Sequence, residues 1–127
     1  MCNADLDQLL LIDDEVIAEL RDVMQEDFIV LIHHFVSDAP LQFDLLQAAI
    51  DERDADGLYR IAHKFKSSCG SIGVPRLAEL IRRLEQAGRQ KVLDGAAELL
   101  ARAQAVATET VAGLQVIIQS GESLAKQ

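Results

Sequence analysis

Residues 25–51 read QEDFIVLIHHFVSDAPLQFDLLQAAID and carry a strong helical signal. Apolar side chains recur every three or four residues and so share one face of a helix: Phe28, Leu31, Ile32, Phe35, Ala39, Phe43, Leu46 and Ile50. Pro40 lies within this face, and a proline inside a helix removes one backbone hydrogen bond. Because the apolar face keeps its phase on both sides of Pro40, the pattern predicts one kinked helix rather than two.

Helical spacing continues in both directions from this stretch. Asp13 and Asp54 are suitable N-caps, the glycines at 70–73 suit a helix C-terminus, and Pro75 suits a first turn. The pattern predicts four more helices: a short one after Ile12, one from Asp54 to about residues 70–73, one from Pro75 to Gly88, and one over about residues 93–118.

The composition agrees with helices. The chain has 127 residues, half of them apolar, with four Phe, one Tyr, no Trp and two Pro, which favours packed helices over sheets. Long amphipathic helices with short links predict an all-α fold: an antiparallel up-down-up-down four-helix bundle with a short additional N-terminal helix. We expect a single domain over residues 1–127, with a polar tail from about residue 120 that frays.

The charge of the chain excludes some classes of partner. The formal net charge is −9, which argues against general binding to nucleic acid or anionic membrane, since both need a cationic surface. Residues 60–91 differ, because they hold eight basic and two acidic side chains, a net +6. The N-terminus contains no recognisable signal peptide or spanning helix, and Cys2 and Cys69 are isolated thiols. We therefore expect a cytoplasmic protein.

His63 is the candidate reactive residue. It lies on the third expected helix, on the side away from the apolar face, and is therefore expected to face solvent. Lys66 follows at i+3, while Ser67 and Gly70 lie one and two turns further along and leave the imidazole accessible. Phosphoryl transfer needs this combination: a neutral imidazole nitrogen as nucleophile, in-line access to phosphorus, and a cation beside the transferred group.

Residues 62–73 read AHKFKSSCGSIG and resemble the signature of histidine-containing phosphotransfer (HPt) domains. In that family a histidine is followed by Lys at i+3, small residues at i+4 and i+5, and Gly at i+10; Lys66, Ser68 and Gly73 match. Position i+4 is usually Gly. Ser67 stands there, and its hydroxyl would either hydrogen-bond the imidazole or narrow access to it. Similar segments at residues 20–21, 26–28, 38–40 and 80–85 extend the resemblance over nearly the whole chain.

The resemblance implies a phosphocarrier without intrinsic kinase activity. His63 would accept a phosphoryl group from a receiver-domain aspartyl-phosphate and pass it to another receiver aspartate, while Lys66 would stabilise that group. Ser67, Ser68 and Gly70 would keep access to the imidazole open. The implied partners are response-regulator receiver domains, of a hybrid sensor kinase and of a downstream regulator. Magnesium would be bound by the receiver, so no cofactor and no metal are expected in this chain.

A receiver would also need a docking surface around the histidine. Receiver domains present an acidic pocket, which basic side chains from residues 60–91 would complement. The basic candidates are Lys64, Arg82 and Arg83. The apolar candidates for the centre of the interface are Ile17, Leu20 and Tyr59, each of which could equally belong to the core.

Other interpretations carry less weight. A phosphate-independent adaptor could bind a receiver or another signalling protein through the same helix face, but it would need neither His63 nor Lys66. A sensor-kinase dimerisation helix is disfavoured, because Lys64 rather than an acidic residue follows the histidine. A metal site inside the bundle is disfavoured, because no Glu precedes any histidine by three residues. We expect a monomer, with self-association through the last helix as the alternative.

Overall fold

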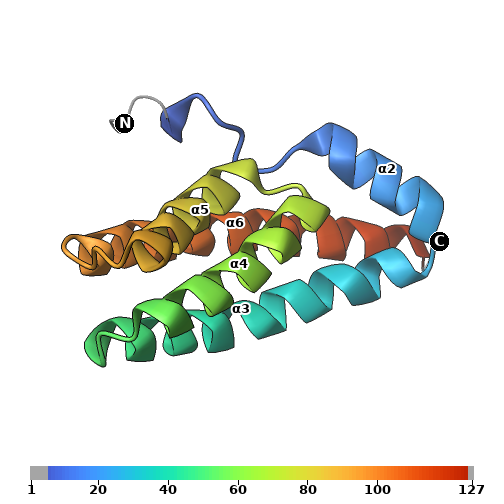
Figure 1. Cartoon of the computed structure of the whole chain (residues 1–127). Helices are drawn as coiled ribbons and strands as arrows, with labels where there is room; N and C mark the ends of the chain where they lie inside the picture. The colour runs from blue at the N-terminus through green and yellow to red at the C-terminus, as the bar shows by residue number, and fades with distance from the viewer. Residues whose placement is uncertain (1–5, 126–127) are drawn as a thin grey trace.

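Five α-helices lie in residues 6–125, the part of the chain that the computed structural model describes (Figure 1). They are α2 (Asp14–Met24), α3 (Asp27–Asp51), α4 (Ala55–Ile72), α5 (Pro75–Gln90) and α6 (Ala96–Ala125). These residues contain no strand. The all-α prediction is confirmed.

Helices α3 to α6 form an antiparallel bundle in which each successive helix reverses direction (Figure 1). α4 packs against α3 and α5, and α6 closes the bundle by packing against the same two helices. α2 lies against α3 and α4 near one end of the bundle. This is the predicted up-down-up-down four-helix bundle with a short additional helix.

The helix α3 is continuous through Pro40, as predicted. Its buried side chains follow the expected spacing of three or four residues: Phe28, Ile32, Phe35, Ala39, Phe43, Leu46 and Ala49. Pro40 itself is exposed, so the missing backbone donor falls on the solvent side of the helix. The apolar face therefore stays on the core along the whole length of α3.

The predicted helix-terminal residues form the expected caps. Asp13 accepts hydrogen bonds from backbone N–H groups in the first turn of α2, and Asp54 does the same for α4. Gly73 ends α4 in the left-handed conformation, with φ of +85°, which costs glycine little because it has no Cβ. Pro75 stands in the first turn of α5.

The predicted end of α5 is wrong: the helix passes through Gly88 and continues to Gln90. Gly88 is buried where α5 crosses α4. A Cβ atom there would lie 2.6 Å from the backbone nitrogen of Tyr59 and 2.7 Å from the carbonyl oxygen of Ala55. The glycine therefore serves close helix packing rather than helix termination.

The predicted limits of the last helix are also wrong. α6 begins at Ala96, directly after Gly95 with φ of +82°, and it continues to Ala125. The helical backbone thus extends through most of the segment expected to be a frayed polar tail, because helical hydrogen bonding does not require an apolar face. Its buried side chains include Ala96, Leu100, Ala103, Ala107, Thr110, Leu114 and Ile118.

Backbone contacts fix α2 beside the C-terminal end of α4. The Asp13 N–H donates to the carbonyl oxygen of Gly73 at 2.8 Å, and the Arg76 N–H donates to the carbonyl oxygen of Leu10 at 3.1 Å. Gly73 also lies directly beneath Val16, because a Cβ on the glycine would be 2.7 Å from the Val16 Cβ. The short helix is therefore attached at the end of α4.

The centre of the core is formed by phenylalanines from α3 and α4. The ring of Phe65 stacks on that of Phe35, with centroids 6.1 Å apart, and meets the edge of Phe43 at 5.5 Å. In the described residues no buried side-chain nitrogen or oxygen lacks a hydrogen-bond partner. Within the same residues, no helix combines the length and the apolar character needed to cross a membrane.

Candidate functional site

His63 lies in the middle of α4 on the solvent side of the helix, as predicted. The opposite side of α4 is buried, and this fixes which way the imidazole points. The side chain of His63 is 56% exposed. The ring is therefore accessible to a macromolecular partner while it remains attached to a rigid helix.

One ring nitrogen of His63 is bound by a buried carboxylate from α5. Glu85 Oε2 lies 2.9 Å from His63 Nδ1, and the Glu85 side chain is only 7% exposed. Both carboxylate oxygens also lie 3.0 Å from Lys66 Nζ. Glu85 therefore joins the histidine and the lysine of α4 to α5.

This hydrogen bond determines which nitrogen of the neutral imidazole is reactive. An ionised carboxylate can only accept hydrogen bonds, so Nδ1 carries the hydrogen and donates it to Glu85. The lone pair of the neutral ring is then on Nε2, which makes no hydrogen bond to the residues that the structure describes. The geometry thus favours one tautomer, with its nucleophilic nitrogen on an exposed side chain.

The environment of Glu85 keeps its carboxylate ionised. Burial alone would raise the pKa of Glu85, but hydrogen bonds from Lys66 and His63, together with the positive charge of the Lys66 ammonium, outweigh burial and lower it. The carboxylate can consequently act as a permanent negative charge beside the imidazole and favour positive charge that develops on the ring.

Lys66 lies beside His63, as the i+3 spacing predicts, with its side chain 30% exposed. Its ammonium group contacts Glu85 rather than standing alone in solvent. An ammonium has three N–H donors, and the two oxygens of Glu85 can occupy at most two of them. At least one donor remains for an anion bound near His63.

The serines after His63 bond to the helix backbone. Ser67 Oγ donates to the carbonyl oxygen of His63 at 3.1 Å, and Ser71 Oγ donates to that of Ser67 at 3.0 Å. The Ser67 hydroxyl therefore does not hydrogen-bond the imidazole, which was one of the two predicted alternatives. Ser68 Oγ lies 3.5 Å from the carbonyl oxygen of Lys64. A Cβ atom added to Gly70 would meet nothing within 4 Å, so this stretch is open.

Two hollows flank the histidine-bearing helix beyond His63. One, of about 340 Å³, lies between α2, α4 and α5 and is lined in part by Val16, Lys66, Gly70, Ala78 and Arg82. The other, of about 380 Å³, lies between α3 and α4 and is lined in part by Leu31, His34, Lys64, Ser67 and Ser71. Concave surface is therefore present on both sides of Ser67, Ser68 and Gly70, which we call the small-residue row.

The basic docking candidates differ in accessibility. Lys64 is exposed at the edge of the hollow between α3 and α4. Arg82 makes two hydrogen bonds of 2.8 Å to Glu79 and is 40% exposed. Arg83 Nε donates to the same carboxylate at 3.1 Å, and its side chain is only 13% exposed. Lys64 and Arg82 are thus more accessible to a partner than Arg83.

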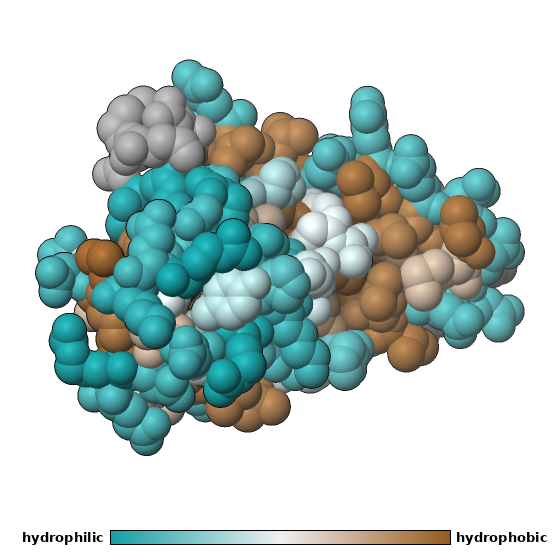
Figure 2. Space-filling model, in the orientation of Figure 1, coloured by the Kyte–Doolittle hydropathy of each residue, from teal (hydrophilic) through white to brown (hydrophobic). Residues whose placement is uncertain are grey.

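The apolar docking candidates divide in the same way. Ile17 is only 5% exposed and belongs to the core, so the docking prediction for this residue is wrong, because the inner face of α2 packs on the bundle. Leu20 is half-buried at the edge of the core, and Tyr59 is half-buried beside His63. Figure 2 shows apolar surface between α2 and α3 and hydrophilic surface over much of α4 and α5. On the face in this view, the apolar surface therefore lies near α2.

Sequence reasoning missed Glu85 as a residue of the site. The apolar pattern of α5 contained a signal that Glu85 is buried. Glu85 lies on the same helix face as Ile81, one turn earlier, and Gly88, three residues later, and both of these residues are buried. A carboxylate at such a position needs a cationic or donating partner, because an unpaired buried charge is costly. The pattern alone did not identify that partner, which comes from another helix.

The described residues contain no group of three or more His, Cys, Asp or Glu side chains that could hold a metal ion. The charged and titratable groups of the site are the imidazole, the Glu85 carboxylate and the Lys66 ammonium. An exposed helical imidazole with one nitrogen bound to a buried carboxylate and a lysine beside it has the features of a histidine phosphocarrier.

Comparison with known families agrees with this class. The family model described as Hpt domain matches residues 30–116, and the chain belongs to the Hpt domain family. It therefore has a histidine phosphotransfer role in two-component signalling, with receiver domains as partners, and Hpt domains are phosphocarriers rather than catalysts.

A solved structure supports the same family. The chain is similar to histidine-containing phosphotransfer protein B (HptB) from Pseudomonas aeruginosa PAO1, with 29% sequence identity and a TM-score of 0.84. The alignment covers 87% of this chain and 96% of the HptB chain. A search of curated proteins gave no match.

Proposed function

We propose that Nε2 of His63 accepts a phosphoryl group from the aspartyl-phosphate of one receiver domain and passes it to the aspartate of another. The observation that carries this proposal is the hydrogen bond of 2.9 Å between His63 Nδ1 and the buried Glu85. It holds the proton on Nδ1 and leaves the lone pair on the exposed nitrogen.

The phosphoryl transfer needs no further reactant besides His63 and the aspartate of the receiver. The Nε2 lone pair forms a bond to phosphorus while the bond from phosphorus to the aspartate oxygen breaks, and the aspartate leaves as a carboxylate. The imidazole keeps its Nδ1 hydrogen and becomes cationic, a charge that Glu85 stabilises at 2.9 Å. Transfer to the second receiver is the same step in reverse.

Lys66 and the small-residue row support this transfer in different ways. The spare donor of Lys66 would bind the equatorial oxygens of the phosphoryl group and offset their charge. Ser67, Ser68 and Gly70 would leave room for the rim of a receiver. We expect magnesium to be held by the receiver, so that this chain contributes no metal ligand and no cofactor.

Docking of the receiver would use both charge and apolar contact. The exposed Lys64 and Arg82 would complement the acidic pocket of a receiver, and Leu20 would contribute apolar surface. The donor we propose is the receiver domain of a hybrid sensor kinase, and the acceptor is the receiver of a downstream regulator. The carrier would act as a monomer.

The test uses phosphorylated receivers from the same organism with the wild-type chain, and compares His63→Gln with His33→Gln. His33 is exposed on α3, so its replacement controls for loss of a surface histidine. We expect acid-labile phosphate on the wild type and on the His33 variant and none on the His63 variant. Labelling of the His63 variant, or failure of every receiver to load the wild type, would contradict the proposal.

The same experiment separates the carrier from a phosphate-independent adaptor. An adaptor would bind a receiver without accepting phosphate, and that binding would survive His63→Ala unchanged. If the chain is a carrier, the wild-type protein that has bound a phosphorylated receiver should itself carry phosphate. Sedimentation of the wild-type chain at several concentrations tests the monomer, since self-association through α6 would give a dimer mass.

A further inference from the structure

Tyr59 lies one helical turn before His63, and the two rings are stacked. Their centroids are 5.7 Å apart and their planes differ by 20°. Residues at i and i+4 share a helix face, so the contact follows from the regular backbone of α4. The tyrosine therefore covers one face of the imidazole next to the hydrogen bond with Glu85.

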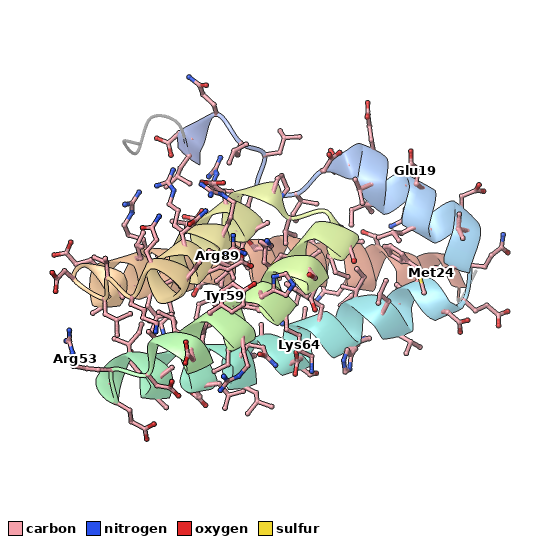
Figure 3. The ribbon with its side chains drawn as sticks, viewed as in Figure 1. Glu19, Met24, Arg53, Tyr59, Lys64 and Arg89 are labelled. Atoms are coloured by element: carbon pink, nitrogen blue, oxygen red, sulfur yellow. The ribbon has the colours of Figure 1, made fainter. Side chains whose placement is uncertain are left out.

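Tyr59 is itself held from α5. Arg89 Nη2 donates to the Tyr59 hydroxyl oxygen at 3.2 Å, and the Arg89 guanidinium lies over the tyrosine ring, 5.3 Å from its centroid. Figure 3 shows these side chains adjacent to each other, from α4 and α5. Gly88 allows this approach, since any Cβ there would overlap the Tyr59 backbone. The tyrosine ring is thus fixed from two helices.

The imidazole needs a restraint of this kind. More than half of the His63 side chain is exposed, so core packing does not fix its ring plane. The bond to Glu85 fixes one atom, Nδ1, but a ring held at one atom can still tilt. A flat ring packed against its face removes that freedom, and fixing the direction of the nucleophile is a recognised source of rate.

We propose that Tyr59 is a positioning residue for phosphoryl transfer, which holds the plane of the His63 imidazole so that Nε2 points in one direction. This inference rests on the proposed function of His63. This positioning role differs from the docking role that the sequence suggested for Tyr59. A docking residue would change the affinity for a receiver, whereas a positioning residue changes the rate within the complex.

The test compares Tyr59→Leu, which removes the flat ring, with Tyr59→Phe, which keeps it and loses only the hydroxyl bond to Arg89. Single-turnover transfer from a phosphorylated receiver is measured over a range of receiver concentrations. We expect the Leu variant to be about tenfold slower at saturation with an unchanged half-saturating concentration. We expect the Phe variant to stay within about twofold of the wild type.

A second measurement needs no receiver. Relaxation of the His63 side-chain nuclei in the unphosphorylated protein reports motion of the imidazole, and we expect greater mobility in the Leu variant than in the Phe variant or the wild type. Equal mobility in all three proteins would overturn the inference. The inference would also be overturned if the Leu variant needed a higher half-saturating receiver concentration but kept the wild-type rate at saturation. If the wild type accepts no phosphate at all, the proposed function fails, and the relaxation data still decide whether Tyr59 restrains the imidazole.

Discussion

At the scale of single residues, the proposed mechanism makes the reactivity of the imidazole depend on one carboxylate, that of Glu85. We expect Glu85→Gln to fold normally, because glutamine has nearly the same shape and can still accept the Nδ1 hydrogen. The charge that stabilises the cationic ring is lost, and a charge-assisted hydrogen bond becomes a neutral one. We expect transfer to slow by about tenfold, the equivalent of about 1.4 kcal/mol. If Glu85→Gln transfers phosphate at the wild-type rate, Glu85 has no role in the mechanism.

The same residue predicts a dependence of stability on pH. Since the pKa of Glu85 is lowered in the folded state, its contribution to stability is present above the unfolded-state value of about 4.3 and is lost as pH falls through the lower folded value. Urea unfolding at pH 7 and at acidic pH measures this loss. We expect the wild type to lose more stability than Glu85→Gln over that range. Glu79→Gln is a second test on the same helix, since hydrogen bonds from Arg82 first, and also Arg83, lower the pKa of Glu79, and we expect this variant also to lose less stability than the wild type.

At the scale of the helix, two glycines near the end of α4 have opposite requirements. Gly70 is exposed, and a Cβ would meet nothing, so Gly70→Ala should stabilise the protein by about 0.5–1 kcal/mol. Gly73 has φ of +85° and lies beneath Val16, so Gly73→Ala should destabilise it by more than about 1 kcal/mol. Thermal unfolding of both variants checks the difference in sign. A Gly70→Ala variant that is stable but slow in transfer would support the access role of this position.

Helical periodicity made most of the elements predictable. The spacing of apolar residues located α3, α4 and α5, the cap at Asp13 gave the start of α2, and the caps at Asp54 and Gly73 gave both limits of α4. The errors at the ends of α5 and α6 have different physical causes. Gly88 was interpreted from its local propensity, but its environment is a contact between helices, and α6 continues beyond its apolar pattern. Local sequence does not record which helix will lie against a given residue.

The site shows the same limit. His63 and Lys66 could be proposed from the sequence because they belong to one helix and one short motif, whereas Glu85 and Arg89 reach the site from α5. Ile17 was a plausible surface residue in an isolated amphipathic helix, and only the docking of α2 on the bundle buries it. Residues within one element could thus be predicted from sequence, and contacts between elements could not.

At the scale of the whole molecule, the cooperative stability of the bundle should control the reactivity of Cys69. The thiol is completely buried, and burial raises its pKa to about 12, so thiolate is scarce at neutral pH. In a Cys2→Ser variant, where Cys69 is the remaining thiol, we expect a disulfide reagent to react orders of magnitude more slowly with native than with urea-unfolded protein. Similar rates in the two states would mean that the bundle opens locally at α4.

The ring that covers the imidazole gives the protein a property of a different kind. The chain has one tyrosine and no tryptophan, so its near-ultraviolet fluorescence comes chiefly from Tyr59. That chromophore is in contact with His63, and a phosphoryl group on the imidazole would change the charge within a few ångströms of it. If His63 is the phosphoacceptor as proposed, we expect the emission of the unlabelled protein to change when the site is occupied, so that phosphate loading can be followed continuously without a radioactive or attached probe.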